Sequence, residues 1–221
     1  MNIRDFLSAR EKFCLFLTGQ AASGKTTLVK SLSHECPGVI YLSLDDYFIG
    51  DSSYRKSRTR SLVLSNGSLR SHITMTDWWD WNLLCAHIVH HKRMGYYKIL
   101  VDGAVLPSPV FYEHFDSIFF LLHPENKRFR DLFKRDSAKR SQSELVTRLQ
   151  ITNYAEALSY CLFLNSGSAL NGKLIVAIDR HGERITNIQP IGIFLARMQT
   201  SIDHGLDEQS LHILVKNLQS D

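Results

Sequence analysis

Long apolar runs are missing from this sequence of 221 residues. No run approaches the roughly 18 to 20 apolar residues that a membrane-spanning helix needs, so the sequence predicts no membrane partner. Charged side chains also interrupt the first twelve residues, which therefore lack the apolar stretch of a signal peptide. We expect a short surface helix there instead.

Cysteine, proline and glycine are scarce as well. The 4 cysteines are scattered and form no C-x-x-C pair, which argues against a disulfide-stapled secreted domain and predicts reduced thiols in a cytoplasmic protein. With 5 prolines and 12 glycines beside 44% hydrophobic residues, the chain is neither collagen-like nor disordered. Its length suits one α/β domain over residues 1–221.

A large excess of charge of one sign is also absent. The formal net charge is +4, which does not indicate a nucleic-acid partner but is compatible with small anionic ligands. The composition is equally compatible with a monomer and with an oligomer.

The first elements along the chain are expected to form a βαβ unit. The apolar run Phe13–Leu17 is typical of a strand buried on both faces of a parallel sheet. A helix is expected over residues 26–35, because Pro37 follows it and proline cannot continue a helix. A second strand is expected over residues 39–44. The pattern predicts an α/β fold.

The rest of the chain continues this alternation. Residues 50–76 contain few apolar side chains and are expected to form a surface insertion on the substrate side. Asp77 is the expected N-cap of the next helix, with Asp80 in its first turn. Further strands are expected at 98–101, 118–122, 161–164 and 173–179, and further helices at 125–139, 143–160 and 208–218.

The most specific motif is Gly19–Thr26, which matches G-x-x-x-x-G-K-[ST] between the first strand and the first long helix. Its glycines allow backbone N–H groups to point at a phosphate. Lys25 is expected to bridge the β- and γ-phosphates, and the Thr26 hydroxyl to bind Mg²⁺. The alternative is a plain strand-to-helix turn. The candidate nucleotide-binding residues are Gly19, Ala22, Ser23, Gly24, Lys25, Thr26 and Thr27.

Further along, the segment Leu42–Phe48 resembles the S-x-D-x-F-Y segment of the uridine kinase-like group of P-loop kinases, which includes nicotinamide riboside, pantothenate and phosphoribulose kinases. The resemblance implies that Asp45 is the base that accepts the proton of a substrate hydroxyl. It also implies a three-layer P-loop NTPase sandwich with a mainly parallel sheet, helices on both faces and a helical lid. Similar segments follow in the same order: Asp77–Leu84, Leu100–Gly103, Lys134–Asp136 with Lys139 and Arg140, and Asn165–Ala177.

The resemblance implies an enzyme that uses ATP and Mg²⁺ to phosphorylate a hydroxyl group of a small metabolite, most simply a nucleoside or ribosyl compound. It assigns a lid to residues 125–142, with Arg135 and Arg140 offsetting charge on the transferred phosphoryl group. Three departures are visible: Asp102 replaces a glutamate, the Pro and His of the D-h-P motif are missing, and no glycine follows Arg140. The alternative is a nucleotide-binding regulatory or interaction module with weak catalysis.

Reasoning from the residues alone supports the same carboxylates. Asp45 and Asp102 each end an expected strand, where open α/β sheets bind ligands. Asp102 is therefore a candidate metal ligand beside Thr26, or a structural turn residue. Asp45 is a candidate base, with an N-cap or turn role and a base at Asp46 as alternatives.

Other candidate residues have two interpretations each. The basic stretch from Lys127 to Arg140 is either a solvated helix face or the lid. The basic residues of the insertion could bind an anion or keep a loop soluble. The three tryptophans could stack on a ring or fill the core, and His87 with His91 has no third zinc ligand at a recognisable spacing. The basic residues of the insertion are Arg55, Lys56, Arg58 and Arg60, and the tryptophans are Trp78, Trp79 and Trp81.

Overall fold

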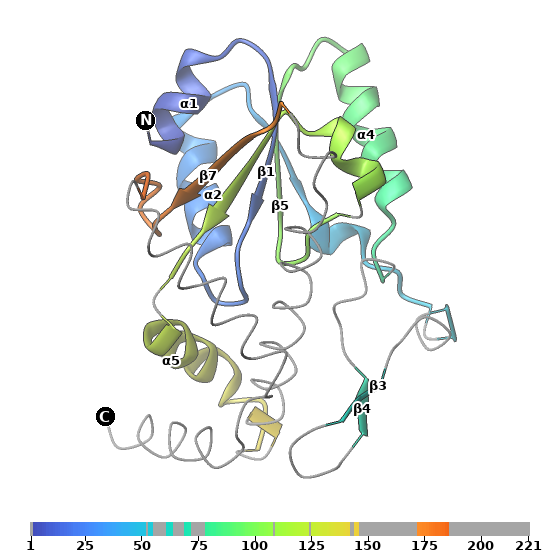
Figure 1. Ribbon diagram of the computed structural model, residues 1–221, viewed down its shortest axis with the longest axis vertical. Coiled ribbons are helices and arrows are strands. Elements are labelled where there is room, and N and C mark those ends of the chain that lie inside the picture. Colours follow the sequence, from blue (N-terminus) through green and yellow to red (C-terminus); the bar gives the residue numbers. More distant parts are fainter. Residues whose placement is uncertain are drawn as a thin grey trace.

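A computed structural model describes residues 2–51, 53–54, 61–63, 69–71, 78–107, 109–123, 125–141, 144–145 and 172–185. Within these residues the centre of the fold is a five-stranded, all-parallel sheet in the order β2-β5-β1-β6-β7 (Figure 1). The predicted α/β fold with a parallel sheet is confirmed. The strands are β1 (Phe13–Thr18), β2 (Ile40–Ser43), β5 (Lys98–Gly103), β6 (Ser117–Leu121) and β7 (Leu174–Ile178).

Helices cover both faces of this sheet. Figure 1 shows α1 and α2 on one side and α4 on the other, with α5 beyond the carboxyl ends of the strands. The arrangement gives the three layers that the sequence predicts. The helices are α1 (Ile3–Ala9), α2 (Lys25–Glu35), α4 (Trp81–Arg93) and α5 (Glu125–Asp136), with the 3-10 helices η1 (Leu44–Tyr47) and η3 (Pro109–His114).

The central strand β1 is buried along its whole length and serves two cores. Phe13, Leu15 and Leu17 pack with residues of α1 and α2. Cys14 and Phe16 point to the opposite face and pack with residues of α4 and η3. Side chains of a strand alternate between the faces of the sheet, so a continuous apolar run is what a strand between two helical layers requires.

The helix α4 begins later than predicted. The carboxylate of Asp80 accepts a hydrogen bond from the backbone N–H of Leu83 at 2.9 Å, so Asp80 is the N-cap and Trp81 the first helical residue. The prediction that Asp80 lies in the first turn is therefore wrong. An N-cap side chain accepts a hydrogen bond from the backbone N–H of the second or third helical residue, and Leu83 is the third. Asp77, the predicted cap, lies outside the described residues.

Other boundaries also differ from the predictions. The strand β5 continues through Asp102 and Gly103, because its register with β1 pairs Leu17 with Asp102 and Thr18 with Gly103. The insertion 50–76 contains an antiparallel hairpin of β3 (Ser61–Val63) and β4 (Leu69–Ser71), where the sequence predicts only a surface excursion.

Several predicted elements cannot be compared. Most of the predicted helix 143–160, the predicted strand 161–164, the helix 208–218 and the basic residues 55–60 lie outside the described residues. Among the helices that are described, none has the length and apolar character to cross a membrane.

Candidate functional site

The loop Gly19–Gly24 connects β1 to α2 at the carboxyl edge of the sheet. It begins against the end of β6. A Cβ atom added to Gly19 would lie 2.6 Å from the carbonyl oxygen of Leu121 and 2.8 Å from the Oγ of Ser23. Only glycine fits here without moving the backbone of a neighbouring strand, which explains the first glycine of the motif.

The loop backbone has the shape of an anion-binding turn. Gly24 is the N-cap of α2 with a φ of 100°, and Ala22 also has a positive φ of 61°. The backbone N–H of Ser23 donates to the carbonyl oxygen of Gln20 at 3.0 Å. Left-handed residues next to a helix N-terminus turn successive N–H groups toward one point, which is how such loops hold phosphate groups.

Two hydroxyl groups near this loop are buried without a hydrogen-bond partner in the described structure: Thr18 Oγ1 and Ser23 Oγ. Buried polar atoms are normally paired, so an unpaired one needs an explanation. A phosphate oxygen over the loop would supply a partner to Ser23. The residues present therefore fit a nucleotide, and the exposed Thr26 and Thr27 follow in the first turn of α2.

Lys25 lies across the beginning of the loop. Its ammonium nitrogen donates to the carbonyl oxygens of Gly19 at 2.6 Å and Gln20 at 3.1 Å. The side chain therefore follows the loop and does not point into either core. This is the placement expected of a lysine that serves phosphate groups and not packing.

Asp102 reaches the same edge of the sheet from β5, the strand next to β1. It is only 5% exposed, and burial raises the pKa of its carboxyl group, as does the charge of Asp45. A hydrogen bond from the hydroxyl of Tyr41 at 2.5 Å and the charge of Lys25 act in the opposite direction on that pKa. The buried carboxylate is thus close enough to the loop to interact with Lys25.

Asp45 lies in η1, directly after β2, and is exposed. The N-cap of this turn is Ser43, so an N-cap role for Asp45 is wrong. Asp46 is exposed in the same turn, but its charge raises the pKa of Tyr47, after the larger effect of burial. Burial, and to a smaller extent the charge of Asp46, also raises the pKa of Tyr41, which donates to Asp102, while burial and the charge of Asp45 raise the pKa of Asp102 itself. The structure therefore brings Asp45, Asp102 and Lys25 into one electrostatic neighbourhood.

Arg128 is the residue of this region that the sequence interpretation missed. Its side chain is 1% exposed, and its Nη1 donates to the carbonyl oxygen of Ala21 in the loop at 3.5 Å. Arg128 thus joins α5 to the phosphate loop. A signal was present: Leu132, one helical turn later, is also buried, so Arg128 occupies the apolar face of an otherwise charged helix.

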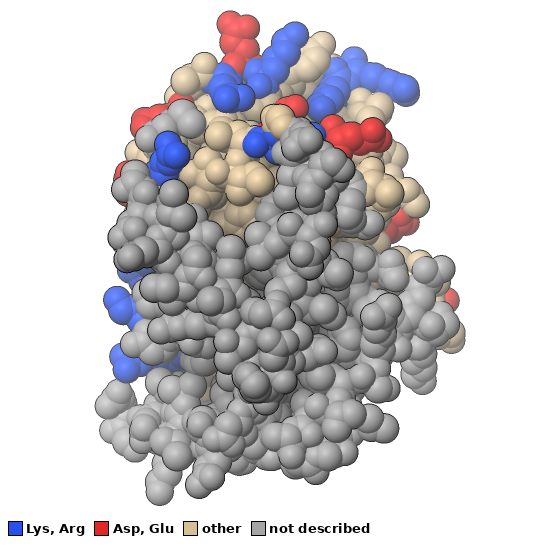
Figure 2. Space-filling model, viewed as in Figure 1, with Lys and Arg blue, Asp and Glu red and all other residues tan. Residues whose placement is uncertain are grey.

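The two arginines predicted to act in catalysis are brought together elsewhere on α5 and just after it. The Nε of Arg135 donates to Asp136 Oδ1 at 2.8 Å, and the Nε of Arg140 lies 4.0 Å from Asp136 Oδ2. Other basic side chains stand on the exposed surface of α5 (Figure 2). This stretch thus has both a solvated face and, through Arg128, a contact with the loop.

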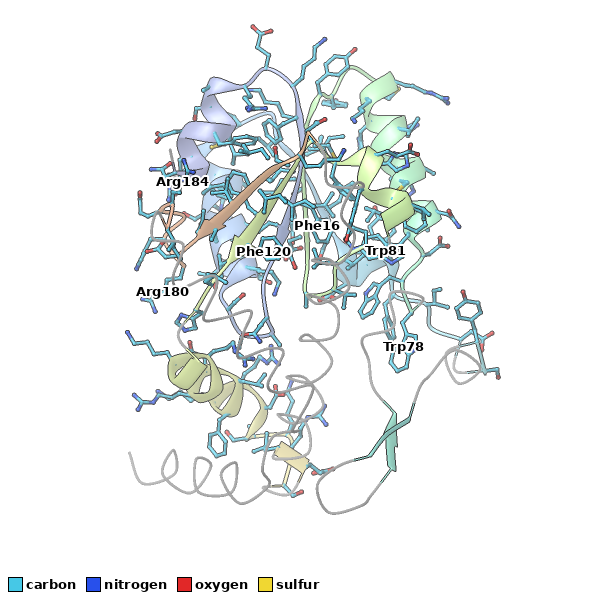
Figure 3. The ribbon with its side chains drawn as sticks, viewed as in Figure 1. Phe16, Trp78, Trp81, Phe120, Arg180 and Arg184 are labelled. Carbon is cyan, nitrogen blue, oxygen red and sulfur yellow. The ribbon has the colours of Figure 1, made fainter. Side chains whose placement is uncertain are left out.

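The tryptophans belong to the core. Trp78, Trp79 and Trp81 are less than 10% exposed, and the ring of Trp81 lies 6.1 Å from that of Phe16 (Figure 3). The core interpretation of these residues is confirmed. His87 shares a hydrogen bond of 2.9 Å with a tyrosine hydroxyl, and the described part of the chain holds no group of three or more His, Cys, Asp or Glu that could bind a metal ion.

Comparisons with known proteins give little beyond the fold. Neither a protein-family model nor a curated protein matches this sequence. Several solved structures are similar. One is a sugar kinase from Janibacter sp. HTCC2649, at 15% identity over 87% of this chain and 95% of that chain, with a TM-score of 0.43. Another is a possible uridine kinase from Bacillus stearothermophilus, at 17% identity over 62% of this chain and 86% of that chain, with a TM-score of 0.39. A gluconokinase from Sinorhizobium meliloti 1021 is similar at 17% identity over 96% of this chain and 98% of that chain, with a TM-score of 0.43.

Similarities at this distance carry no argument about activity, and the three names do not single out the uridine kinase-like group. The sheet order and the loop between β1 and α2 define the class of this chain: an α/β protein with a P-loop NTPase fold. Any more particular assignment depends on the residues of its own site.

Proposed function

We propose that this chain is an ATP-dependent kinase that transfers the γ-phosphoryl group to a hydroxyl of a small metabolite, with a nucleoside or ribosyl compound as the first substrate class to test. The observation that supports this most directly is one juxtaposition at the carboxyl edge of the sheet. A phosphate loop with its lysine lies beside two carboxylates, Asp102 and Asp45, from the ends of β5 and β2.

Each part of the site has a role in this proposal. The loop backbone and Lys25 bind the nucleotide phosphates. The Thr26 hydroxyl and the Asp102 carboxylate offer the oxygen ligands that Mg²⁺ prefers, directly or through water. A bound Mg²⁺ would neutralise charge on the phosphates.

Asp45 acts as the general base. An alcohol barely ionises at neutral pH, so a carboxylate that takes its proton as the bond to phosphorus forms accelerates the reaction. Exposure of Asp45 leaves its oxygens accessible to a substrate. Arg128 then links any movement of α5 to the loop, while Arg135 and Arg140 supply positive charge to the transferred group once they leave Asp136.

The pairing of Arg135 and Arg140 with Asp136 favours one alternative, a nucleotide-binding module without efficient catalysis. A screen of acceptors separates the two functions. Nucleosides, nicotinamide riboside, pantothenate and sugars would be incubated with ATP and Mg²⁺, and acceptor-dependent ADP release measured. We expect release with at least one acceptor in the parent protein and none in Lys25→Ala, which also controls for contaminating kinases. ATP binding without release for any acceptor would favour the module.

A further inference from the structure

Tyr41 makes an unusual contact for a residue of an edge strand. Its side chain is 37% exposed, yet its hydroxyl points inward and donates to Asp102 Oδ1 at 2.5 Å. A separation in this range is typical of a hydroxyl donating to an ionised carboxylate, which is among the stronger hydrogen bonds in proteins. The hydroxyl, and not the ring, is thus the part of Tyr41 that reaches the site.

The register of the sheet explains why a tyrosine is needed. Tyr41 of β2 is paired with Leu100 of β5, while Ser43 is paired with Asp102. Tyr41 therefore reaches Asp102 along the diagonal, which its long aromatic side chain spans. The hydroxyl of Tyr41 thus reaches the buried carboxylate from the edge strand.

We propose that Tyr41 is a positioning residue for Asp102: its hydroxyl holds one carboxylate oxygen and leaves the other for the metal ion that accompanies the nucleotide. This inference rests on the proposed function, in which Asp102 supports Mg²⁺. Groups that hold a metal-binding side chain in place contribute to metal affinity although they never touch the metal. Tyr41 is such a group.

The test compares the binding of ADP in excess Mg²⁺ with its binding in EDTA, both by isothermal titration calorimetry. The ratio of the two affinities isolates the metal. In Tyr41→Phe we expect this ratio to fall roughly 10-fold, with the affinity in EDTA unchanged. Tyr41→Leu, which also lacks the hydroxyl, should show the same fall. Tyr47→Phe is the matched control, because its hydroxyl is hydrogen-bonded to His87 at 2.9 Å, and its ratio should equal that of the parent.

A second arm tests whether Tyr41 acts through Asp102. Asp102→Asn should lower the ratio of the ADP affinity in Mg²⁺ to that in EDTA at least as much as Tyr41→Phe does. The double variant Tyr41→Phe with Asp102→Asn should have the same ratio as Asp102→Asn alone. The inference is overturned if Tyr41→Phe keeps the parental ratio, if it weakens binding equally in EDTA, or if its effect adds in full to that of Asp102→Asn. A parent protein that binds ADP under neither condition would instead refute the proposed function.

Discussion

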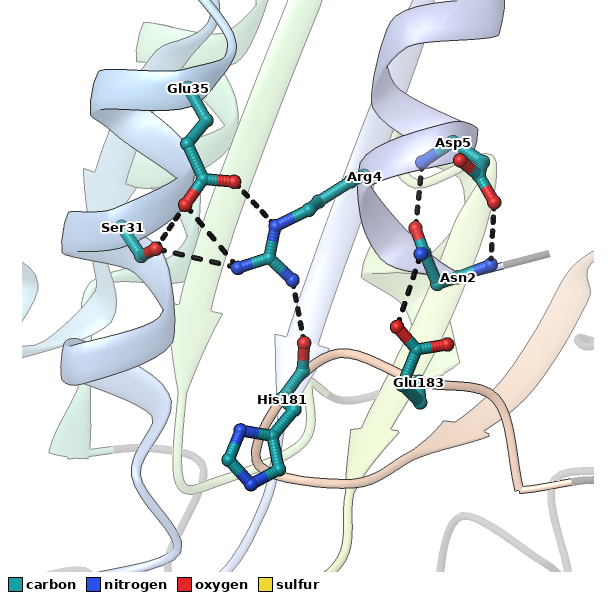
Figure 4. Close-up of polar contacts among 7 residues, drawn as sticks. All are labelled: Asn2, Arg4, Asp5, Ser31, Glu35, His181 and Glu183. Atoms are coloured by element: carbon teal, nitrogen blue, oxygen red, sulfur yellow. Dashed lines mark hydrogen bonds and ion pairs between the residues drawn. The ribbon is translucent and has the colours of Figure 1, made fainter.

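Two polar regions of this protein differ in how their groups are satisfied. On the side of α1 and α2, Arg4 bonds to Glu35 and donates to the carbonyl oxygen of His181 at 2.6 Å (Figure 4). Asn2 caps α1 and donates to Glu183 at 3.2 Å. At the phosphate loop, in contrast, buried hydroxyls lack partners and a buried carboxylate lies beside Lys25.

The contrast shows what each region is for. A polar cluster whose donors and acceptors are paired stabilises the packing of the elements that carry it. Buried groups without partners cost stability, and at this loop a phosphate would supply the missing partner of Ser23. Substitutions in the Arg4 region should therefore change unfolding, and substitutions at the loop should change binding and turnover. Each of the following experiments tests that division.

The largest effect is expected for Asp45→Asn. Asparagine has nearly the same volume but is a far weaker base, so kcat should fall by roughly 10² to 10⁴. Nucleotide affinity and stability should stay within about 1 kcal/mol of the parent, because Asp45 is an exposed surface residue. The control is Asp46→Asn. If that variant loses turnover while Asp45→Asn keeps it, the base is the neighbouring aspartate.

Lys25→Ala should come next. Its ammonium donates to the loop carbonyls of Gly19 and Gln20 and its side chain lies outside both cores, so the fold should persist while affinity for Mg-ATP drops by on the order of 100-fold. Titration calorimetry measures the affinity, and circular dichroism the unfolding temperature. Unchanged affinity would mean that the loop does not bind nucleotide. The loop would then not be a ligand-binding region in contrast to the Arg4 region.

Gly182→Ala tests the opposite region. Gly182 has a φ of +84°, and an added Cβ would lie 2.5 Å from Cγ2 of the buried Ile3. We expect a loss of about 2–4 kcal/mol in unfolding free energy, from the left-handed backbone and from overpacking. Gly38→Ala is the matched control, with a φ of +83° and open space around it, and should lose only about 1–2 kcal/mol. Equal losses would show that the contact with Ile3 contributes nothing.

The smallest effect is expected for Arg4→Gln. Hydrogen bonds from Arg4 and then from Ser31 hold the pKa of Glu35 below its usual range near 4.3. A carboxyl group with a lowered folded-state pKa contributes stability above its unfolded pKa and loses it as the pH falls through the folded value. Because solvent screens this exposed pair, Arg4→Gln should lower the unfolding temperature only slightly at pH 7, and by less at pH 3. A difference that persists undiminished at pH 3 would exclude this ion pair as its source.

The parts of the fold that sequence predicts well are those encoded within a few residues. The strand β1, the loop and the start of α2 follow one another, so an apolar run and a glycine motif suffice to predict them. The contact between Tyr41 and Asp102 spans 61 residues and depends on the pairing of β2 with β5, which no local pattern contains. Arg128 was missed although its spacing to Leu132 placed it on the apolar face of its helix, because its contact with Ala21 spans 107 residues.

The contacts of α1 with the turn after β7 also bear on the order in which the chain folds. The backbone N–H of Ile3 donates to the carbonyl oxygen of Gly182, and Arg4 contacts a residue 177 positions later in the sequence. During synthesis, α1 leaves the ribosome before β7 and cannot complete its packing until β7 and its turn have followed. Contacts this distant along the chain form slowly. The helix α1 therefore reaches its final environment later than its place in the sequence suggests.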